Sequence, residues 1–352
     1  MIEALPISTH SVRSLTIVGD TAIVLGLLGA LAAIALSILA LRSQNHKTRS
    51  YYNKLFQYSI FIVLFAWILG FCAIIWFHVV IYKNLPLKLP DSVVHWLNNS
   101  IRAMNQNSEY DLPLIPLTDA PRYMLPPWLE GEKVYFWCLC FSIIATLAIR
   151  RLKNQKFFLA VGLSLFICSL ITYLVQNPFH EPLPRFFAEI TPFFSAPLAG
   201  YEKIGLFMRL YPRMIFYYNA HYMWIHPPLL FASYALVQMT FLTSIFMLFG
   251  RDRAIEGYGY ACTKLAFFLL TIGMLLGYPW ALKAWGPNWW WDPKIASSIM
   301  MWAVLSTFLH ARLYLNKRGF WYVNAGLGIL CFVAVMFTFL SSYFFPGEHT
   351  LQ

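Results

Sequence analysis

The chain has 352 residues, of which 59% are hydrophobic and only 12% are charged, and its formal net charge is +11. This composition is too apolar for an ordinary soluble domain. The sequence therefore predicts an all-α polytopic membrane protein in which residues 1–352 form a single integral membrane domain.

Eight apolar runs approach or exceed the roughly 20 residues needed to cross the hydrocarbon core of a bilayer. We expect these spans at 15–41, 55–82, 134–149, 157–176, 222–249, 263–282, 294–315 and 320–345. Residues 1–15 lack a basic start followed directly by an apolar core, so we expect the first span to be retained rather than cleaved.

Lys and Arg collect in four short connections, which favours a cytoplasmic position for them. The connections carry basic residues at 42–54, 150–156, 251–264 and 312–318. More than half of the 26 basic residues lie there, so the positive charge is explained by topology and indicates no nucleic-acid partner. Both termini are then expected outside, with the loops 83–133, 177–221 and 283–293.

The two long outer loops differ in composition. The loop 83–133 is rich in Pro and polar residues, which is compatible with a lid, a docking surface or a plain connection. The loop 177–221 carries clustered Phe, Leu and Met residues typical of short amphipathic helices in the membrane interface. We expect Arg209 and Arg213 to face water there.

The six cysteines lie within or beside the apolar runs, where a thiol behaves as a small hydrophobe. Their spacing indicates neither a disulfide framework nor a zinc site. The chain contains no Cys-x-x-Cys-His, so it is not itself a c-type cytochrome.

The most unusual stretch lies between the sixth and seventh spans, where four tryptophans fall within seven positions. It reads Trp285-Gly286-Pro287-Asn288-Trp289-Trp290-Trp291-Asp292-Pro293. An interfacial aromatic belt explains a few tryptophans at a helix end but rarely so many. A wall of indole rings can hold a flat ligand by stacking, and Asp-Pro is a favourable helix start.

Two histidines share the outer face with this loop. His226 opens the fifth span and His349 follows the eighth. Imidazole is a common axial ligand of haem iron. The alternative is that His226 is a polar helix-entry residue and His349 belongs to a frayed terminus.

His310 lies about fifteen residues into the seventh span, roughly 20 Å from the outer edge at 1.5 Å per residue. An ionisable residue at that depth is a functional candidate by default. The alternative is a neutral histidine hydrogen-bonded to a neighbouring helix. His78, near the outer end of the second span, differs from His310 in depth by several turns and is an unfavourable partner for it.

The string from Trp285 to Lys294, together with Trp302 and Leu309-His310-Ala311-Arg312, resembles the tryptophan-rich WWD signature of cytochrome c biogenesis proteins. The resemblance is to the CcsA (ResC) family of system II, with CcmF and CcmC as relatives. It is strong over 215–349, the expected haem-handling core, and architectural before that. His226-Pro227-Pro228 is similar to the form in CcmF.

The resemblance implies a non-covalent haem b in transit as substrate. It implies His226 and His349 as external axial ligands and His310 as an intramembrane ligand, whose partner is His78 or a residue of another chain. The haem-stacking residues would be Trp285, Gly286, Trp289, Trp290, Trp291, Asp292 and Pro293. Lys283, Lys294 and Arg213 are candidates for offsetting the propionates. The family usually has acidic residues where this chain has Lys283 and Ile295.

The implied function is that of a membrane component of a holocytochrome c synthase, a lyase that presents haem for thioether attachment to a Cys-x-x-Cys-His apocytochrome c. The implied partners are a CcsB (ResB) membrane protein, the apocytochrome and thiol-reducing proteins. A bacterial inner membrane with the active face outward is expected, ahead of a thylakoid membrane.

Three alternatives stay open. The chain could be a haem transporter or chaperone of the CcmC kind, a b-type electron-carrier subunit, or a structural subunit whose aromatic loop docks a partner. We assign no role to His46, His95 or His180, and His221 lies close enough to His226 to replace it in an alignment.

Overall fold

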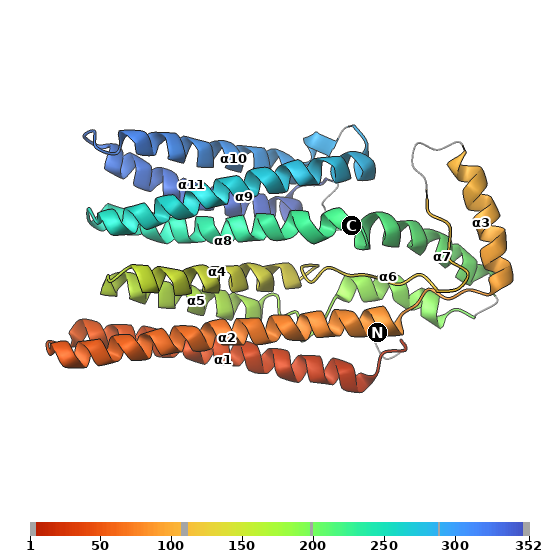
Figure 1. Cartoon of the computed structure of the whole chain (residues 1–352), viewed down its shortest axis with the longest axis horizontal. Coiled ribbons are helices and arrows are strands. Elements are labelled where there is room, and N and C mark those ends of the chain that lie inside the picture. Colours follow the sequence, from red (N-terminus) through yellow and green to blue (C-terminus); the bar gives the residue numbers. More distant parts are fainter. Residues whose placement is uncertain (1–4, 107–111, 198–199, 288, 348–352) are drawn as a thin grey trace.

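The computed structural model describes residues 5–106, 112–197, 200–287 and 289–347, without the side chains of 283–285 and 342. These residues form helices, and the one β-type pairing among them is an isolated bridge between Pro86 and Arg122. Within the described residues, eight helices are long and apolar enough to cross a membrane, which confirms the all-α fold with eight candidate spans (Figure 1).

Each spanning helix overlaps its predicted run. The helices are α1 (Thr9–Arg42), α2 (His46–Asn84), α4 (Glu132–Arg151), α5 (Gln155–Leu174), α8 (His221–Phe249), α9 (Arg253–Trp285), α10 (Pro293–Ala311) and α11 (Phe320–Phe344). Helices α1, α2 and α9 begin six to ten residues earlier than predicted. The third span was predicted as the shortest, and α4 adds residues to it at both ends. The orientation in the membrane stays a prediction.

Three of the turns at the end where Lys and Arg gather start their next helix with the same device. The side-chain oxygens of Asn45, Asn154 and Asp252 accept hydrogen bonds from backbone N–H groups in the first turns of α2, α5 and α9. A short polar side chain at this position satisfies donors that the helix itself leaves unpaired. The fourth turn uses Gly319, whose φ of 84° is costly for other residues.

The spans form two groups of four (Figure 1). The first helix group is α1, α2, α4 and α5, and the second is α8, α9, α10 and α11; α4 packs against α8 to join them. Small residues allow close approach within the first group, since a Cβ atom at Gly29 would lie 2.9 Å from Val63 Cγ2. Close packing at small residues is the common way for helices to associate in lipid.

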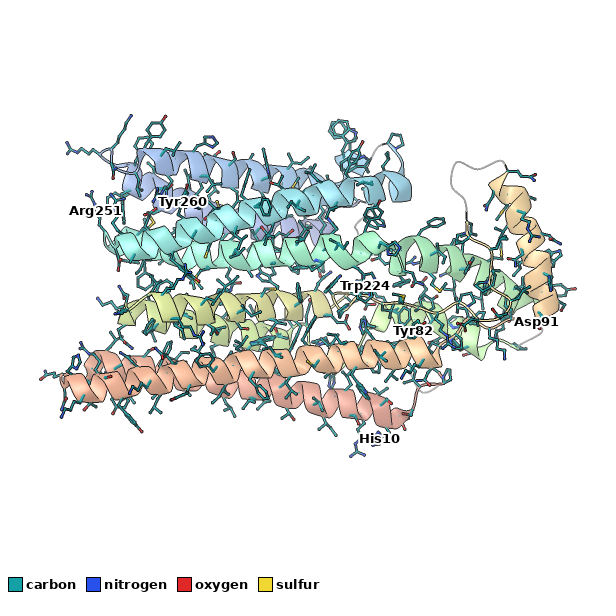
Figure 2. The ribbon with its side chains drawn as sticks, in the orientation of Figure 1. His10, Tyr82, Asp91, Trp224, Arg251 and Tyr260 are labelled. Carbon is teal, nitrogen blue, oxygen red and sulfur yellow. The ribbon has the colours of Figure 1, made fainter. Side chains whose placement is uncertain are left out.

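Short helices cover the end of the bundle predicted to be outside. They are α3 (Asp91–Asn105), α6 (Pro184–Ser195), α7 (Tyr201–Arg213) and the π-helix η2 (Met214–Tyr218). Helices α6 and α7 confirm the short amphipathic helices predicted in 177–221, and Arg209 and Arg213 are exposed as expected. Helix α3, whose first residue Asp91 is labelled in Figure 2, was not predicted; it buries Val94, Leu97 and Ile101 along one face.

The outer loop before α4 is tied to the second helix group. The Asn219 side chain accepts from Met124 N at 2.8 Å and donates to Arg122 O at 2.9 Å. The Trp128 indole donates to Met223 O at 2.6 Å. These bonds hold the loop against the start of α8, at the end of the bundle predicted to be outside.

Candidate functional site

The tryptophan loop is shaped by a glycine and a helix cap. Helix α9 ends at Trp285, and Gly286 follows with a φ of 73°, a conformation that glycine adopts without strain. Residues Trp289–Trp291 form one 3₁₀ turn. Asp292 then caps α10 by accepting from Lys294 N at 2.9 Å, with Pro293 in the first turn, as the sequence predicted.

The described tryptophans of this loop divide into two kinds. Trp289 is half-buried and meets the Tyr278 ring edge-on, with the ring centroids 5.0 Å apart. Trp290 and Trp291 stack with centroids 4.0 Å apart and are 47% and 70% exposed. One ring therefore anchors the loop to α9, and two present a flat aromatic surface. The side chain of Trp285 lies outside the described residues.

The chain after α11 returns to the start of α10. A Cβ atom at Gly347 would lie 2.6 Å from Oδ2 of Asp292 and 2.7 Å from Cδ of Pro293. The tail therefore packs on the end of the tryptophan loop, where glycine allows the approach. The predicted ligand His349 lies outside the described residues.

His226 lies between α8 and the outer part of α9. Its Nδ1 donates to Gly273 O at 2.6 Å, which places the lone pair of a neutral ring on Nε2. The ring rests on Gly277, where a Cβ atom would lie 2.6 Å from its Cε1. Gly277 precedes Trp285 by eight residues, about 12 Å along the helix axis. The structure thus brings His226 to the end of the bundle that carries the tryptophan loop.

His310 is placed at the opposite end. It follows Asp292 by eighteen residues on α10, about 27 Å along the axis, so it does not meet His226. Its side chain is exposed and Nδ1 donates to Ser306 O of its own helix at 2.8 Å. The exposed face of α10 is where any second ligand would have to approach.

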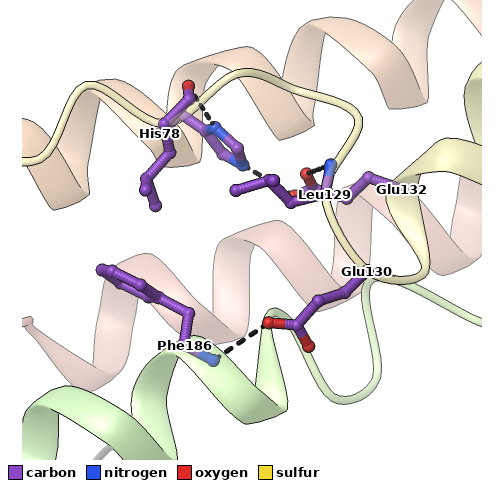
Figure 3. A network of polar contacts seen from close by, with 6 residues as sticks. His78, Leu129, Glu130, Glu132 and Phe186 are labelled. Carbon is purple, nitrogen blue, oxygen red and sulfur yellow. Dashed lines mark hydrogen bonds and ion pairs between the residues drawn. The ribbon is translucent and has the colours of Figure 1, made fainter. Parts of the chain in front are cut away.

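His78 occupies a closed polar site that sequence reasoning missed (Figure 3). Its Nε2 contacts Glu132 Oε1 at 2.7 Å, and its Nδ1 donates to Leu125 O at 2.9 Å. The second oxygen of Glu132 accepts from Leu129 N at 3.3 Å. Both ring nitrogens are therefore used within the fold, and His78 does not lie near His310.

The neighbouring Glu130 holds a different element (Figure 3). Its carboxylate oxygens accept from the backbone N–H groups of Arg185 and Phe186 at 3.1 and 2.9 Å, at the start of α6. A carboxylate is favourable there because the helix N-terminus carries partial positive charge. Glu132, at the start of α4, thus contacts α2, and Glu130 of the preceding loop holds α6.

The residues predicted to offset the propionates differ in whether they already have a partner within the protein. Arg213 is already paired, with Nε 3.0 Å from Glu189 Oε1. Burial raises the pKa of Tyr218 far above its usual range, so this hydroxyl stays protonated and donates to Glu189 at 3.0 Å. Ile295 is half-buried at the start of α10, and the Lys283 side chain lies outside the described residues.

Lys294, in the first turn of α10, has a cationic neighbour that the sequence did not indicate. Lys133 of α4 lies near enough for the two ammonium charges to repel each other. Its Nζ lies 6.0 Å from the centre of the Phe339 ring of α11. Two spans thus place two cations near the start of α10. Lys133 and Lys294 lie 161 residues apart in the sequence, so no local pattern could reveal the pair.

Comparison with known proteins places residues 130–349 within the family model described as cytochrome C assembly protein. The CcsA protein of Synechococcus sp. (strain CC9311) is 34% identical over 92 residues, which cover 25% of this chain and 30% of that protein. The CcsA protein of Lolium perenne is 42% identical over 65 residues, which cover 18% of this chain and 20% of that protein. The matched segments thus span less than a third of these relatives.

One solved structure, named cytochrome c heme lyase CcmF, matches with a TM-score of 0.61 and 17% identity. The match covers 93% of this chain and 47% of that one. At this identity it shows a shared fold over nearly the whole chain.

Proposed function

Because this integral membrane chain belongs to the cytochrome c assembly protein family, we propose that it is the haem-handling component of a cytochrome c synthase. In this proposal the chain receives haem b, holds it at the outer end of the bundle and supports its attachment to an apocytochrome c carrying Cys-x-x-Cys-His. The observation that supports it best is the position of His226, whose ring rests on Gly277, next to the Tyr278 that Trp289 contacts.

His226 and His349 would hold the iron from the two sides. The hydrogen bond from His226 Nδ1 to Gly273 O fixes the ring so that Nε2 is the coordinating atom, which is how ligand histidines are commonly oriented. The exposed pair Trp290 and Trp291 would stack on the porphyrin. Lys294 and Lys133 would offset the negative charge of the propionates.

The reaction needs little acid–base chemistry from the protein. Each thiol adds across a vinyl group, its sulfur to one carbon and its hydrogen to the other, so no electrons are gained or lost overall. The chain would contribute position, by directing the vinyl edge toward the incoming peptide and keeping the iron ligated until the substrate's own histidine replaces an enzyme histidine.

His310 would bind haem earlier, before the outer site. Because it lies on the exposed face of α10, its second ligand would come from a CcsB (ResB) partner chain rather than from His78, whose ring nitrogens are hydrogen-bonded. In this proposal the membrane is a bacterial inner membrane with the tryptophan loop outside, and thiol-reducing proteins supply the apocytochrome in reduced form.

The test begins with the visible spectrum of the purified protein and a denaturing gel stained for haem. We expect a b-type spectrum and haem that leaves on denaturation. His226→Ala and His349→Ala should each lower bound haem by about tenfold or more, and added imidazole should restore part of it. His221→Ala is the matched control, since it changes an exposed histidine at the start of the same helix.

Coexpression with a Cys-x-x-Cys-His substrate separates the remaining functions. Covalent cytochrome c supports the synthase. Haem release without covalent product would indicate a transporter, and haem that cycles electrons but never leaves would indicate a carrier. Full haem retention in both histidine variants would refute the outer site.

A further inference from the structure

A groove of about 420 Å³ runs along α8 between α4 and α9, on the seam where the two helix groups meet. Ala232 and Leu236 of α8 line its floor. Its walls extend from Cys140 to Arg151 on α4 and from Tyr258 to Leu269 on α9. Eleven residues on each helix correspond to about 16 Å, roughly half of a 30 Å hydrocarbon core. The groove therefore has the depth of one bilayer leaflet.

The lining changes character at one end. Most of the groove is aliphatic, and its rim residues Ile143, Leu147 and Leu265 are 43%, 50% and 48% exposed, so it opens toward lipid. At the end where basic residues gather, the lining contains Arg151, whose charge acts on Tyr258 across the groove.

Arg151 is a charge without a counter-ion in the described part of the chain, where none of the ion pairs involves it. Its neighbour Arg150 is placed differently, with its guanidinium 5.1 Å from the centre of the Phe61 ring. Adjacent arginines on one helix thus face different surroundings. A lone guanidinium at the mouth of an apolar slot favours a ligand with an anionic head and an apolar tail.

The groove is open along its rim, so the basic residue at one end decides its occupant more than the volume does. An acyl chain is narrow enough to enter. Basic sites between spanning helices on the cytoplasmic side bind anionic lipid head groups.

We propose that this groove binds an anionic phospholipid, with one acyl chain between α4 and α9 and the phosphate on Arg151. The bound lipid would fill the seam on this side of α8, where Tyr258 Oη reaches across to donate to Ile144 O at 3.1 Å. It would come from the leaflet on the Arg151 side, and the proposal is independent of any role in haem handling.

Native mass spectrometry of the full-length protein tests the proposal, using phosphatidylglycerol or phosphatidylcholine added after delipidation in detergent. We expect one phosphatidylglycerol to be retained, with at least fivefold weaker retention of phosphatidylcholine. Arg151→Gln should weaken phosphatidylglycerol retention about fivefold, the effect of one basic residue near an anionic surface. Arg150→Gln, the matched control, should leave retention unchanged.

A second variant keeps the test independent of charge. Ala261→Phe places a large ring in the groove wall and should abolish retention while Arg151 is intact. Thermal unfolding and gel filtration of each variant confirm that it is folded. Equal retention of both lipids, or unchanged retention in Arg151→Gln or Ala261→Phe, would overturn the proposal. The proposal would also be overturned if the purified protein carried haem or another non-lipid molecule in this groove, which Ala261→Phe removed and Arg151→Gln did not.

Discussion

His78 in the first helix group and His310 in the second are held in opposite ways. His78 is 7% exposed and has both ring nitrogens hydrogen-bonded, one to a buried carboxylate. His310 is exposed on α10, and within the described residues its Nδ1 bonds to its own helix. The first arrangement holds a loop on a helix. The second leaves a polar side chain facing outward from a span, where lipid or another chain can reach it.

The helices around the two residues differ in the same sense. In α2, which carries His78, 44% of the most apolar stretch is buried inside the protein, against 22% in α10. A well-covered span stabilises the fold, while a poorly covered one offers its surface to lipid or to another chain. We therefore expect substitutions in the first helix group to change stability and those around the tryptophan loop to change haem content.

The largest effect is expected for His78→Ala. Removal of the imidazole leaves the buried Glu132 carboxyl with only the Leu129 N–H as a described partner, which should lower the free energy of unfolding by about 3 to 5 kcal/mol. Haem per folded molecule should stay unchanged. Denaturant unfolding in detergent measures the first quantity and the haem spectrum the second, with His95→Ala, an exposed histidine on α3, as control. Loss of haem with stability retained would instead identify His78 as an iron ligand.

Gly277→Ala should act on haem instead. Its Cβ would lie 2.6 Å from the His226 ring, so the imidazole must move and bound haem should fall by about tenfold. Gly257→Ala on the same helix is the control, because a Cβ atom there meets nothing within 4 Å. Unchanged haem in Gly277→Ala would show that the ring position does not matter for binding.

Asp292→Ala and Asp252→Ala remove equivalent caps at opposite ends of the bundle. Each should cost about 1 kcal/mol of unfolding free energy, since a helix start loses its side-chain acceptor. Only Asp292→Ala should also lower haem content, because it shapes the end of the tryptophan loop. Thermal unfolding and haem content of both variants check this, and an equal loss of haem in both would contradict it.

The smallest effect on stability is expected for Trp291→Ala. This ring is 70% exposed, so unfolding should change by less than about 0.5 kcal/mol. Haem affinity should fall a few-fold, the effect of about 1 kcal/mol of lost ring stacking. Haem titration measures it, and Trp96→Ala, another exposed tryptophan on α3, should leave affinity unchanged.

The spans could be predicted because one local property of the sequence, a long apolar run, indicates a membrane helix. The cap at Asp292 and Pro293 was also readable, since capping depends on adjacent residues. Helix α3 was missed because the segment is polar overall and rich in Pro. Its apolar residues Val94, Leu97 and Ile101 recur at helical spacing along one face only.

The rest of the candidate site depends on contacts between distant residues. His78 meets Glu132 across 54 positions, and the His226 ring rests on a glycine 51 positions later. The local sequence around a histidine in an apolar run does not reveal whether its partner is a carboxylate or a metal. The sequence therefore yielded candidate ligands, and only the three-dimensional packing separated the hydrogen-bonded His78 from the exposed His310.

The pairing of His78 with Glu132 also bears on the order in which the chain is made. Both residues, and Leu125 between them, leave the ribosome well before any part of the second helix group has been synthesised. The enclosed polar site can thus close while the later spans are still absent, as expected when folding proceeds from the N-terminus. The hydrogen bond from Trp128 to Met223 O can form only after α8 has been made. The first helix group can therefore fold first and provide the surface against which α8 packs.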